Sequence, residues 1–244
     1  MIVIPMAGLS SRFTKAGYDK PKYMLKAKNK TLFQHSVESF KKYFDSEQFL
    51  FIALEIQNTE QFIEKECRKF GLKNYQTVIL PKPTKGQAET VYMGLKEAMV
   101  AGSEHLIIFN IDTFRPGFTL PTSFSIRGVD GYLETFIGSG ANWSNVVPIS
   151  DNSDRVKLTA EKEEVSELCC TGLYVWSKSE LFYQTFQELS LQRPEQLNGG
   201  EYYIAPMYNT IIKSGGDIRY TVIDKSEVVF CGVPEEYMEF IAAS

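Results

Sequence analysis

Short apolar runs alternate with stretches of helical spacing through the first half of the chain. Four apolar runs are typical of buried strands: residues 2–7, 49–55, 77–81 and 106–112. Three intervening stretches have the spacing of amphipathic helices: residues 31–44, 59–71 and 86–101. Thr59 is expected to cap the second helix, and Gly71 to end it. This alternation predicts an α/β fold with a doubly wound, mostly parallel sheet and right-handed crossovers.

The second half of the chain has a less regular pattern. Further strands are expected at residues 131–137, 144–150, 155–160, 168–176, 218–224 and 228–232. Helices are expected at about residues 178–190 and 201–214, with a short one at the C-terminus. No linker rich in Pro, Gly or Ser separates the halves. We therefore expect a single domain over 1–244, with halves 1–115 and 116–244 and a sheet that becomes mixed.

Three unusual polar segments follow the predicted strands of the first half. They are MAGLSSR at 6–12, PKPTKGQ at 81–87, and Asn110-Ile111-Asp112. In open α/β sheets, ligands bind at the carboxyl ends of the strands. The pattern therefore predicts that these segments converge on one edge of the sheet and form a binding site.

Composition excludes some classes of function. The formal net charge of −4 argues against a nucleic-acid-binding protein. No stretch reaches the roughly 18 apolar residues of a membrane span, and nothing at the start is typical of a signal peptide. The four cysteines lack the paired spacing of a zinc site, which favours reduced thiols and the cytoplasm.

Basic residues are concentrated in the first 30 positions, against this acidic background. They are Arg12, Lys15, Lys20, Lys22, Lys26, Lys28 and Lys30. The cluster fits either a site for a compact anion or a solvated lysine face. Small residues in the loop allow its backbone N–H groups to approach a polyphosphate: Ala7, Gly8, Ser10 and Ser11. Arg12 adds a bidentate fork that matches a phosphate, and Lys22 follows a stiffening proline.

Asp112 ends the most apolar run of the chain. A carboxylate there is costly unless it is paired, hydrogen-bonded or bound to a metal. A hard oxygen ligand beside a triphosphate indicates Mg²⁺, held by few protein groups and mostly by phosphates and water. A helix N-cap is the structural alternative at this position.

The segments MAGLSSRF and AGYDKPKYML together resemble the N-terminal signature of the sugar-phosphate nucleotidyltransferases, the nucleoside-diphosphate-sugar pyrophosphorylases. The resemblance implies a Rossmann-like nucleotidyltransferase fold with a nucleotide-binding half (1–115) and an acceptor-binding lobe (116–244). It further implies that Arg12 binds the triphosphate, that Lys22 stabilises charge at the α-phosphate, and that Asp112 is the principal metal ligand. Gly86 and Gln87 would hold the base, which favours a pyrimidine nucleotide and leaves cytosine, uracil and thymine open.

The resemblance extends more loosely over the second half. Glu161-Lys162 resembles a pair whose lysine meets the acceptor phosphate, although it lies in a charged run typical of a solvated face. Gly172 and Glu201 match elements beside the acceptor pocket. Relatives often carry a second metal aspartate shortly before a Gly-Thr-Pro element. Here Gly232-Val233-Pro234 matches that element, but Phe230 stands at the aspartate position, and Asp224 is either a substitute ligand or a turn residue.

The function implied by this resemblance is transfer of a nucleoside monophosphate from an NTP to a small phosphorylated acceptor, with release of pyrophosphate. Relatives of this compact length serve capsule and surface-polysaccharide synthesis, and they activate hexose phosphates, phosphocholine or similar small phosphates. An ionised acceptor phosphate needs no general base, which suits two histidines without partner patterns. One alternative is a nucleotide-sugar-dependent glycosyltransferase, because Asn110-x-Asp112 resembles its metal motif, although the Arg12 and Lys22 spacing is foreign to it. Another is a non-catalytic nucleotide-binding regulatory protein, favoured by Phe230.

Overall fold

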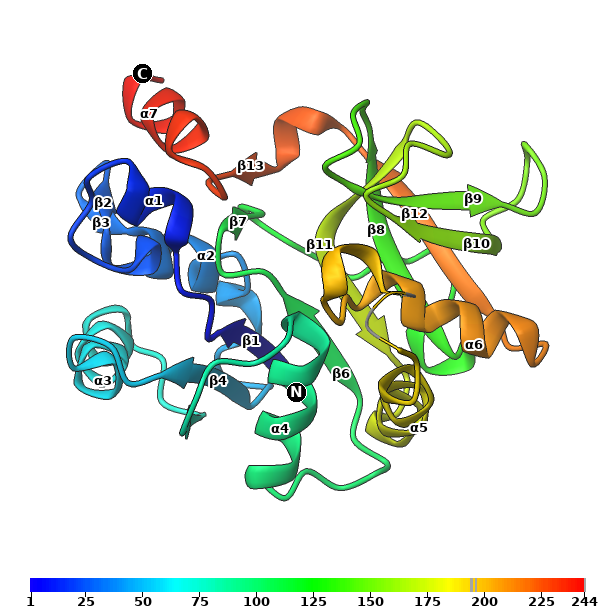
Figure 1. Ribbon diagram of the computed structural model, residues 1–244, viewed down its shortest axis with the longest axis horizontal. Coiled ribbons are helices and arrows are strands. Elements are labelled where there is room, and N and C mark those ends of the chain that lie inside the picture. The colour runs from blue at the N-terminus through cyan, green and yellow to red at the C-terminus, as the bar shows by residue number, and fades with distance from the viewer. Residues whose placement is uncertain (194, 196, 244) are drawn as a thin grey trace. The chain divides into compact units, whose positions relative to one another are not determined.

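The computed structural model describes residues 1–193, 195 and 197–243 and has an α/β fold (Figure 1). The chain forms two compact units. The first, here called the amino-terminal unit, comprises Ile2–Pro83, Phe109–Thr119 and the chain from Ser226 onward. The second, the central unit, comprises Met1, Thr84–Ile108 and Leu120–Lys225. Each unit combines strands and helices, which confirms the predicted fold class.

The described residues of the amino-terminal unit form seven strands and four α-helices. Its strands are β1 (Ile2–Met6), β2 (Lys26–Ala27), β3 (Lys30–Thr31), β4 (Phe49–Leu54), β5 (Tyr75–Leu80), β7 (Thr113–Phe114) and β13 (Val229–Phe230). Its helices are α1 (Ser11–Lys15), α2 (Leu32–Glu38), α3 (Thr59–Phe70) and α7 (Pro234–Ala242). Short 3₁₀ turns occupy Lys22–Met24 and Lys41–Tyr43.

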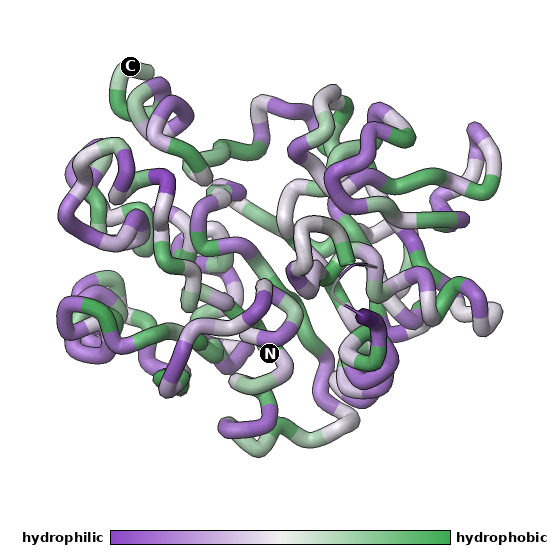
Figure 2. The backbone as a smooth tube through the Cα atoms, in the orientation of Figure 1, coloured by the Kyte–Doolittle hydropathy of each residue, from purple (hydrophilic) through white to green (hydrophobic). Residues whose placement is uncertain are grey.

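A parallel sheet in the order β1-β4-β5 forms the base of this unit. Every residue of β1 and β4 is buried, as expected of central parallel strands covered on both faces. In Figure 2, α3 shows both green, hydrophobic residues and purple, hydrophilic ones. This mixture is that of an amphipathic helix, whose apolar side faces the sheet. Gly71 adopts a left-handed conformation (φ 82°) directly after α3, so its predicted role as terminator is confirmed.

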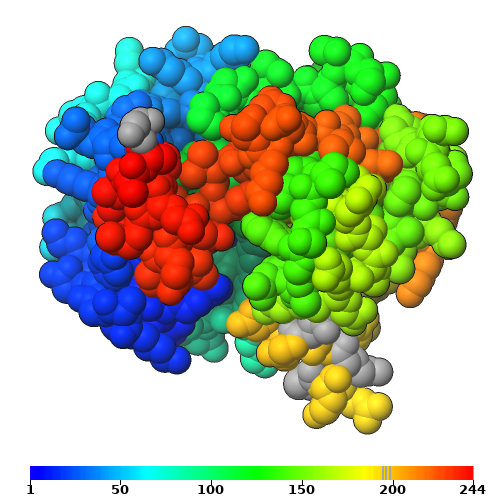
Figure 3. Space-filling view, turned by 90° about the horizontal axis from the view of Figure 1, so that it is seen from above, coloured from blue at the N-terminus to red at the C-terminus, as the bar shows by residue number. Residues whose placement is uncertain are grey.

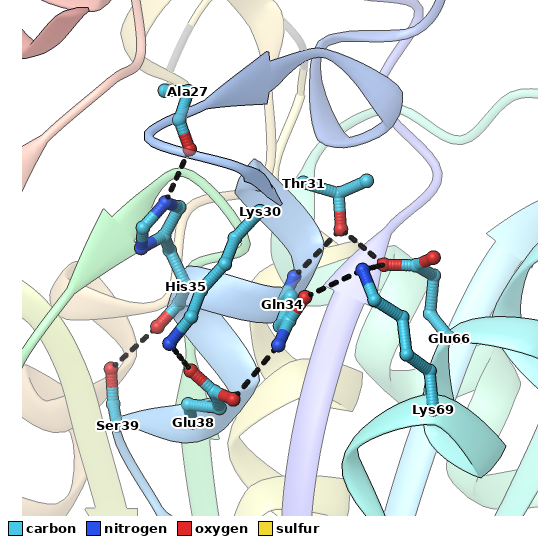
Figure 4. A network of polar contacts seen from close by, with 9 residues as sticks. All are labelled: Ala27, Lys30, Thr31, Gln34, His35, Glu38, Ser39, Glu66 and Lys69. Atoms are coloured by element: carbon cyan, nitrogen blue, oxygen red, sulfur yellow. Dashed lines mark hydrogen bonds and ion pairs between the residues drawn. The ribbon is translucent and has the colours of Figure 1, made fainter.

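A polar network on α2 connects it with α3 and the β2–β3 hairpin (Figure 4). The Thr31 hydroxyl accepts a hydrogen bond from the Gln34 N–H (3.1 Å) and donates to Glu66 Oε2 (2.7 Å). On the same helix, the Ser36 hydroxyl donates to the Asn110 carbonyl (3.2 Å). The Ser39 hydroxyl accepts from the Arg115 N–H (2.8 Å). Helix α2 thus holds the backbone on both sides of Asp112.

Helix α7 packs on the amino-terminal segment, where Figure 3 shows it in red against blue residues. The Tyr237 hydroxyl donates to the Lys26 carbonyl (2.8 Å), and the Tyr237 ring meets the Phe13 ring edge-to-face at 6.1 Å. One apolar cluster joins these elements: Phe13, Leu25, Ala27, Leu32, Phe114, Cys231 and Tyr237. This cluster ties the end of the chain to the loops that carry Lys22 and Asp112.

In its described residues, the central unit contains six strands and three α-helices. Its strands are β6 (Leu106–Phe109), β8 (Gly131–Ile137), β9 (Ser144–Pro148), β10 (Val156–Glu161), β11 (Leu168–Trp176) and β12 (Ile218–Ile223). Its helices are α4 (Gln87–Glu97), α5 (Ser179–Ser190) and α6 (Tyr208–Lys213), the last preceded by a 3₁₀ turn at Ala205–Met207. The sheet order is β10-β9-β11-β6, with β8 antiparallel to β11 and parallel to β12. The predicted mixed sheet is therefore confirmed.

Several predicted boundaries were wrong for local reasons. The helix predicted at 31–44 ends at Glu38, where the backbone hydrogen bonds change: the Ser39 and Phe40 N–H groups donate to the Ser36 and Val37 carbonyls, three residues back (3.1 and 3.0 Å). Thr59 is the first residue of α3 rather than its cap; Asn58 precedes it, and the Glu55 carboxylate accepts the Thr59 N–H (2.9 Å).

Other predicted elements are shorter than expected. The strand predicted at 106–112 ends at Phe109, because Asn110 begins a turn in which its carbonyl accepts the Thr113 N–H (3.2 Å). Helix α4 ends at Glu97, and the α-helical part of the predicted 201–214 helix is α6 alone.

The compact units divide the chain at other positions than the expected halves. Residues 84–108 belong with the second half, and the C-terminal segment belongs with the first.

The four cysteines are buried free thiols, as predicted. In the part of the chain that the structure describes, no helix is long and apolar enough to cross a membrane.

His35 on α2 is expected to make stability depend on pH. Burial lowers its pKa most strongly and the nearby charges of Lys30 and Lys28 lower it further, while a bond to the Ala27 carbonyl and the Glu38 carboxylate oppose the shift. In the unfolded chain the histidine pKa is about 6.5. The unfolded chain therefore binds a proton at His35 more readily than the folded chain does. The free energy of unfolding should fall as the pH drops below that value.

The measurement is urea unfolding of wild type and His35→Gln at pH 7.5 and pH 5.5. His35→Gln should lose less stability between the two pH values than wild type, because it removes this titration and leaves His105 in both proteins. Equal losses in the two proteins contradict the assignment.

Candidate active site

Lys22 and Asp112 meet in the amino-terminal unit although 90 positions separate them. Lys22 begins the 3₁₀ turn after Pro21, and Asp112 lies in the turn between β6 and β7. Lys22 Nζ donates to Asp112 Oδ2 at 2.5 Å. Their side chains are 20% and 22% exposed, so the pair is partly buried but open to a ligand. Two of the three residues predicted to be catalytic are thus in direct contact.

Opposing effects set the charge of Asp112. Burial raises the pKa of its carboxyl, but the charge and hydrogen bond of Lys22, a backbone hydrogen bond and the charge of Arg12 together outweigh burial. The net shift is downward, so Asp112 is ionised at neutral pH. Arg12 lies on α1 with its side chain exposed. A carboxylate and two cations therefore share one corner of the unit.

Ser10 fixes the glycine-containing loop to Lys22. Its hydroxyl accepts the Lys22 N–H at 3.1 Å, and its carbonyl accepts the Thr14 N–H at 3.1 Å. Ser10 has a left-handed backbone (φ 52°, ψ 32°), a conformation that is uncommon for a non-glycine residue. The predicted loop and the predicted lysine are therefore parts of one structure.

The loop presents donors to its surroundings. Among the described residues, none accepts a hydrogen bond from the backbone N–H of Gly8, Leu9 or Ser10. A Cβ placed on Gly8 would have no atom within 4 Å, so the loop is open on that side. Ala7 is buried at the end of β1, while Ser11 is exposed at the start of α1. Unpaired N–H groups beside two cations are suited to anionic oxygens.

We expect Ser10→Gly to lower kcat about fivefold, because one hydrogen bond of roughly 1 kcal/mol that positions Lys22 is lost. Glycine tolerates the left-handed backbone, so the substitution removes the hydroxyl without adding strain. Ser46→Ala, at an exposed serine of the same unit and outside this loop, should leave kcat unchanged and serves as the control. Equal kcat values for Ser10→Gly and wild type would show that the hydroxyl does not position Lys22.

The sequence did not reveal two further side chains at this corner, Glu236 and Cys231. Strand β13 pairs with β7, Phe230 lies opposite Thr113, and the Cys231 N–H donates to the Asp112 carbonyl (2.8 Å). Burial raises the pKa of the Cys231 thiol to about 12, and the charges of Glu236 and Asp112 add to the shift. Cys231 is therefore a neutral packing residue beside two carboxylates. The only sequence signal for Glu236 was its third position in a helix that begins with proline.

A magnesium ion fits the donors at this corner. Asp112 supplies an ionised carboxylate on a partly exposed side chain, and a cation, the Lys22 ammonium, already lies against it. In the described part of the chain, no group of three or more His, Cys, Asp or Glu side chains gathers as a closed metal site. Mg²⁺ commonly binds through one or two carboxylates together with substrate phosphates and water. The arrangement matches that mode of binding.

In the central unit, Gly86 and Gln87 stand at the start of α4. The Ala88 N–H donates to the Tyr202 carbonyl (2.9 Å), and the Tyr202 N–H donates to the Lys85 carbonyl (2.7 Å). Gly86 has φ 130°, and a Cβ there would lie 2.6 Å from the Tyr202 carbonyl oxygen. Only glycine allows this close pairing, which places the predicted base-binding residues against the segment that contains Glu201.

Gly86→Ala should raise the KM for the nucleotide at least about tenfold, because strain of roughly 1–3 kcal/mol must be relieved by moving the loop away from Tyr202. Gly140→Ala is the matched control, since Gly140 has a similar φ of 108° but no atom within 4 Å of its Cβ position. Steady-state kinetics of both variants with the nucleotide varied makes the comparison. Similar KM values in the two variants contradict a role for the Tyr202 contact.

The predicted acceptor residues also lie together in the central unit. Lys162 Nζ donates to the Tyr203 hydroxyl and lies 4.5 Å from the centre of the Tyr203 ring. The Tyr203 hydroxyl in turn donates to Glu201. Tyr203 is thus the side chain that joins Lys162 to Glu201, a link that the sequence did not reveal.

Glu161 faces the interior beside this group. It is 6% exposed and accepts from the Ser144 hydroxyl, which lies 3.4 Å from the Tyr174 hydroxyl. Burial raises the pKa of Glu161 most strongly, Ser144 and Lys162 oppose the shift, and the charge of Glu201 adds to it. Gly172 has φ 93° at an irregularity of β11, two residues before Tyr174.

Asp224, predicted as a second metal ligand, is exposed just after β12 in the central unit. Its role as a ligand stays a prediction. The structure therefore brings together two groups of predicted residues, one in each unit: Arg12, Lys22 and Asp112 with the loop, and Gly86, Glu161, Lys162 and Glu201 with their tyrosines.

The chain resembles known proteins in sequence and in fold. Neither the protein-family models nor the curated proteins gave a match. Among solved structures, a nucleoside-diphosphate-sugar pyrophosphorylase from Vibrio cholerae RC9 shares 46% identity over 100% of both chains, with a TM-score of 0.94.

More distant structures share the fold. A putative glucose-1-phosphate thymidylyltransferase from Bacillus anthracis is 17% identical over 99% of this chain and 93% of its own, with a TM-score of 0.77. An inositol-1-phosphate CTP transferase from T. maritima is 16% identical over 99% of this chain and 94% of its own, with a TM-score of 0.74. The full-length similarity to the Vibrio protein and the contact between Lys22 and Asp112 agree with the signature in the sequence. The chain therefore belongs to the nucleoside-diphosphate-sugar pyrophosphorylases and is a nucleotidyltransferase.

Proposed function

We propose that this enzyme transfers a nucleoside monophosphate from an NTP, with pyrimidine nucleotides favoured, to a small phosphorylated acceptor such as a sugar 1-phosphate. Pyrophosphate is the second product. The observation that carries the proposal is the pair formed by Lys22 and Asp112, which Ser10 connects to the phosphate-binding loop. Synthesis of surface-polysaccharide precursors in the cytoplasm is the proposed setting, supported by the compact length that the sequence shares with such relatives.

Electrostatic repulsion is the main obstacle to this reaction, because both reactants are anions. In the proposed mechanism, the loop N–H groups and Arg12 hold the triphosphate, and Lys22 neutralises charge at the α-phosphate as an acceptor oxygen attacks it in line. The acceptor phosphate is already ionised at neutral pH, so the nucleophile needs no base. Mg²⁺, when bound to Asp112, would supply further neutralisation of the phosphate oxygens.

The central unit supplies the proposed specificity. Gln87, at the start of α4, would read the base with its amide, which both donates and accepts. Lys162 would bind the phosphate of the acceptor, while Glu161 and Glu201 would accept hydrogen bonds from its hydroxyl groups. The bond between Lys162 and Tyr203 and the bond between Tyr203 and Glu201 support a shared site for these three residues.

Pyrophosphate release tests the proposal. The enzyme is supplied with Mg²⁺, each of the four NTPs or dTTP, and a panel of hexose 1-phosphates, phosphocholine and related phosphates. Release that requires one NTP and one acceptor supports the proposal and identifies both substrates. If nucleotide binds but no pair gives pyrophosphate, the proposed reaction is wrong. If a nucleotide sugar gives up its sugar instead, the glycosyltransferase alternative is correct.

A further inference from the structure

Gly232 has no side chain and therefore leaves a space beside Asp112. The carboxylate of Glu236 borders the same space. A Cβ on Gly232 would lie 3.2 Å from Asp112 Oδ2 and 3.6 Å from Glu236 Oε2. Because Gly232 has only a hydrogen there, the oxygens of Asp112 and Glu236 flank the same point in space. Both belong to the amino-terminal unit, so this proximity lies within one compact body.

Two backbone N–H groups hold the Glu236 carboxylate in this position. The N–H groups of Gly232 and Val233 donate to Glu236 Oε2 at 2.7 and 3.2 Å. Glu236 is the third residue of α7, and Pro234 starts that helix. A glutamate here ordinarily only caps the helix. Both N–H groups bond to Oε2, and within the described residues Oε1 makes no hydrogen bond or ion pair.

A cation placed at this corner would meet two carboxylates, those of Asp112 and Glu236. In the described part of the chain, the Lys22 ammonium pairs with Asp112, the charge of Arg12 also acts on that carboxylate, and no cation pairs with Glu236. The side chain at position 230, where relatives carry their second metal aspartate, is a phenylalanine and has no oxygen. The carboxylate of Glu236, on α7, borders the space beside Gly232. It supplies the oxygen ligand that Phe230 lacks.

We propose that Glu236 is the second carboxylate ligand of the magnesium ion that Asp112 binds, in place of an aspartate at position 230. This inference rests on the proposed function, which brings the ion to the site. On this proposal Asp224, which is exposed in the central unit, is not the second metal ligand. Gly232 is required because any side chain there would fill the space between the two carboxylates.

Binding of Mn²⁺, a paramagnetic substitute for Mg²⁺, tests the assignment by electron paramagnetic resonance. The free Mn²⁺ signal is titrated with wild type, Glu236→Gln, Asp112→Asn and Asp224→Asn, with Mn²⁺ alone and with the NTP that supports pyrophosphate release. Glutamine still offers an oxygen to the Gly232 and Val233 N–H groups, so the cap of α7 remains. Glu235→Gln, at the exposed neighbouring glutamate, is the matched control for the loss of one charge. Thermal unfolding of each metal-free variant reports on the cap separately.

Glu236→Gln should weaken Mn²⁺ binding at least about tenfold, with an unfolding midpoint equal to that of Glu235→Gln, and Glu235→Gln and Asp224→Asn should bind Mn²⁺ as wild type does. Wild-type affinity in Glu236→Gln, together with weak binding in Asp112→Asn, overturns the role of Glu236 while the metal site itself stands. A loss in Asp224→Asn but not in Glu236→Gln also overturns it. If Asp112→Asn binds Mn²⁺ as wild type does, the magnesium site of the proposed function fails as well.

Discussion

Asp112→Asn should lower kcat/KM at least about a thousandfold, which corresponds to roughly 4 kcal/mol of transition-state stabilisation. Asparagine keeps the size of the side chain but removes the charge that Lys22 contacts at 2.5 Å. The lost carboxylate would hold the magnesium ion and orient Lys22 toward the α-phosphate. Steady-state rates of pyrophosphate release at saturating Mg²⁺ measure the effect.

Asp45→Asn is the matched control, because Asp45 is an exposed carboxylate in the same unit. It should retain the activity of wild type. The unfolding midpoint of Asp112→Asn should stay near that of wild type, so that the loss of rate is not a loss of folded protein. Activity of Asp112→Asn within tenfold of wild type is incompatible with a central role for this carboxylate.

Lys22→Met should lower kcat by about a hundred- to a thousandfold, as expected when one preorganised donor to the developing charge is removed. Methionine keeps much of the apolar stem, so the substitution tests the ammonium group rather than packing. KM for the NTP should change much less than kcat, because charge at the α-phosphate rises in the transition state.

Lys20→Met, at an exposed lysine on the same loop, should reduce kcat less than threefold and controls for general attraction of anions. Lys22→Arg keeps the charge but not the compact geometry, so it should be intermediate between wild type and Lys22→Met. If Lys22→Met raises KM and leaves kcat unchanged, Lys22 binds the ground state alone and does not stabilise the transition state.

The strands of the chain were predictable because their signal is local. Residues 168–176 are apolar except for Thr171 and Gly172, and β11 occupies that same range. Helix ends were less predictable, since they depend on side chains elsewhere. Glu55 takes the capping role that the sequence suggested for Thr59, and Ser39 contacts Arg115, which is 76 positions away. These partners lie outside the short stretch of sequence from which a helix end is predicted.

The grouping of the candidate site residues was predictable where residue type and spacing carried the signal. Arg12, Lys22 and Asp112 were proposed from their positions after predicted strands and from resemblance to a known signature, and in the structure Lys22 contacts Asp112. Glu236 was not identified, because its value depends on Gly232 having no side chain and on β13 pairing beside β7. The role of Tyr203 was not predicted, because its hydroxyl joins Lys162 to Glu201 only in the folded chain. Long-range geometry therefore accounts for what the sequence left undetermined.

The fate of the nucleotide phosphates tests nucleotidyl transfer most directly. The enzyme is incubated with the NTP and acceptor that give pyrophosphate, with ³²P at the α-phosphate in one reaction and at the γ-phosphate in another. The α-label should appear in an adduct of nucleotide and acceptor, in equal amount to γ-label in pyrophosphate, and both should vanish in Asp112→Asn. Recovery of the α-label in free nucleoside monophosphate, or of the γ-label in orthophosphate, would show hydrolysis and contradict transfer to an acceptor.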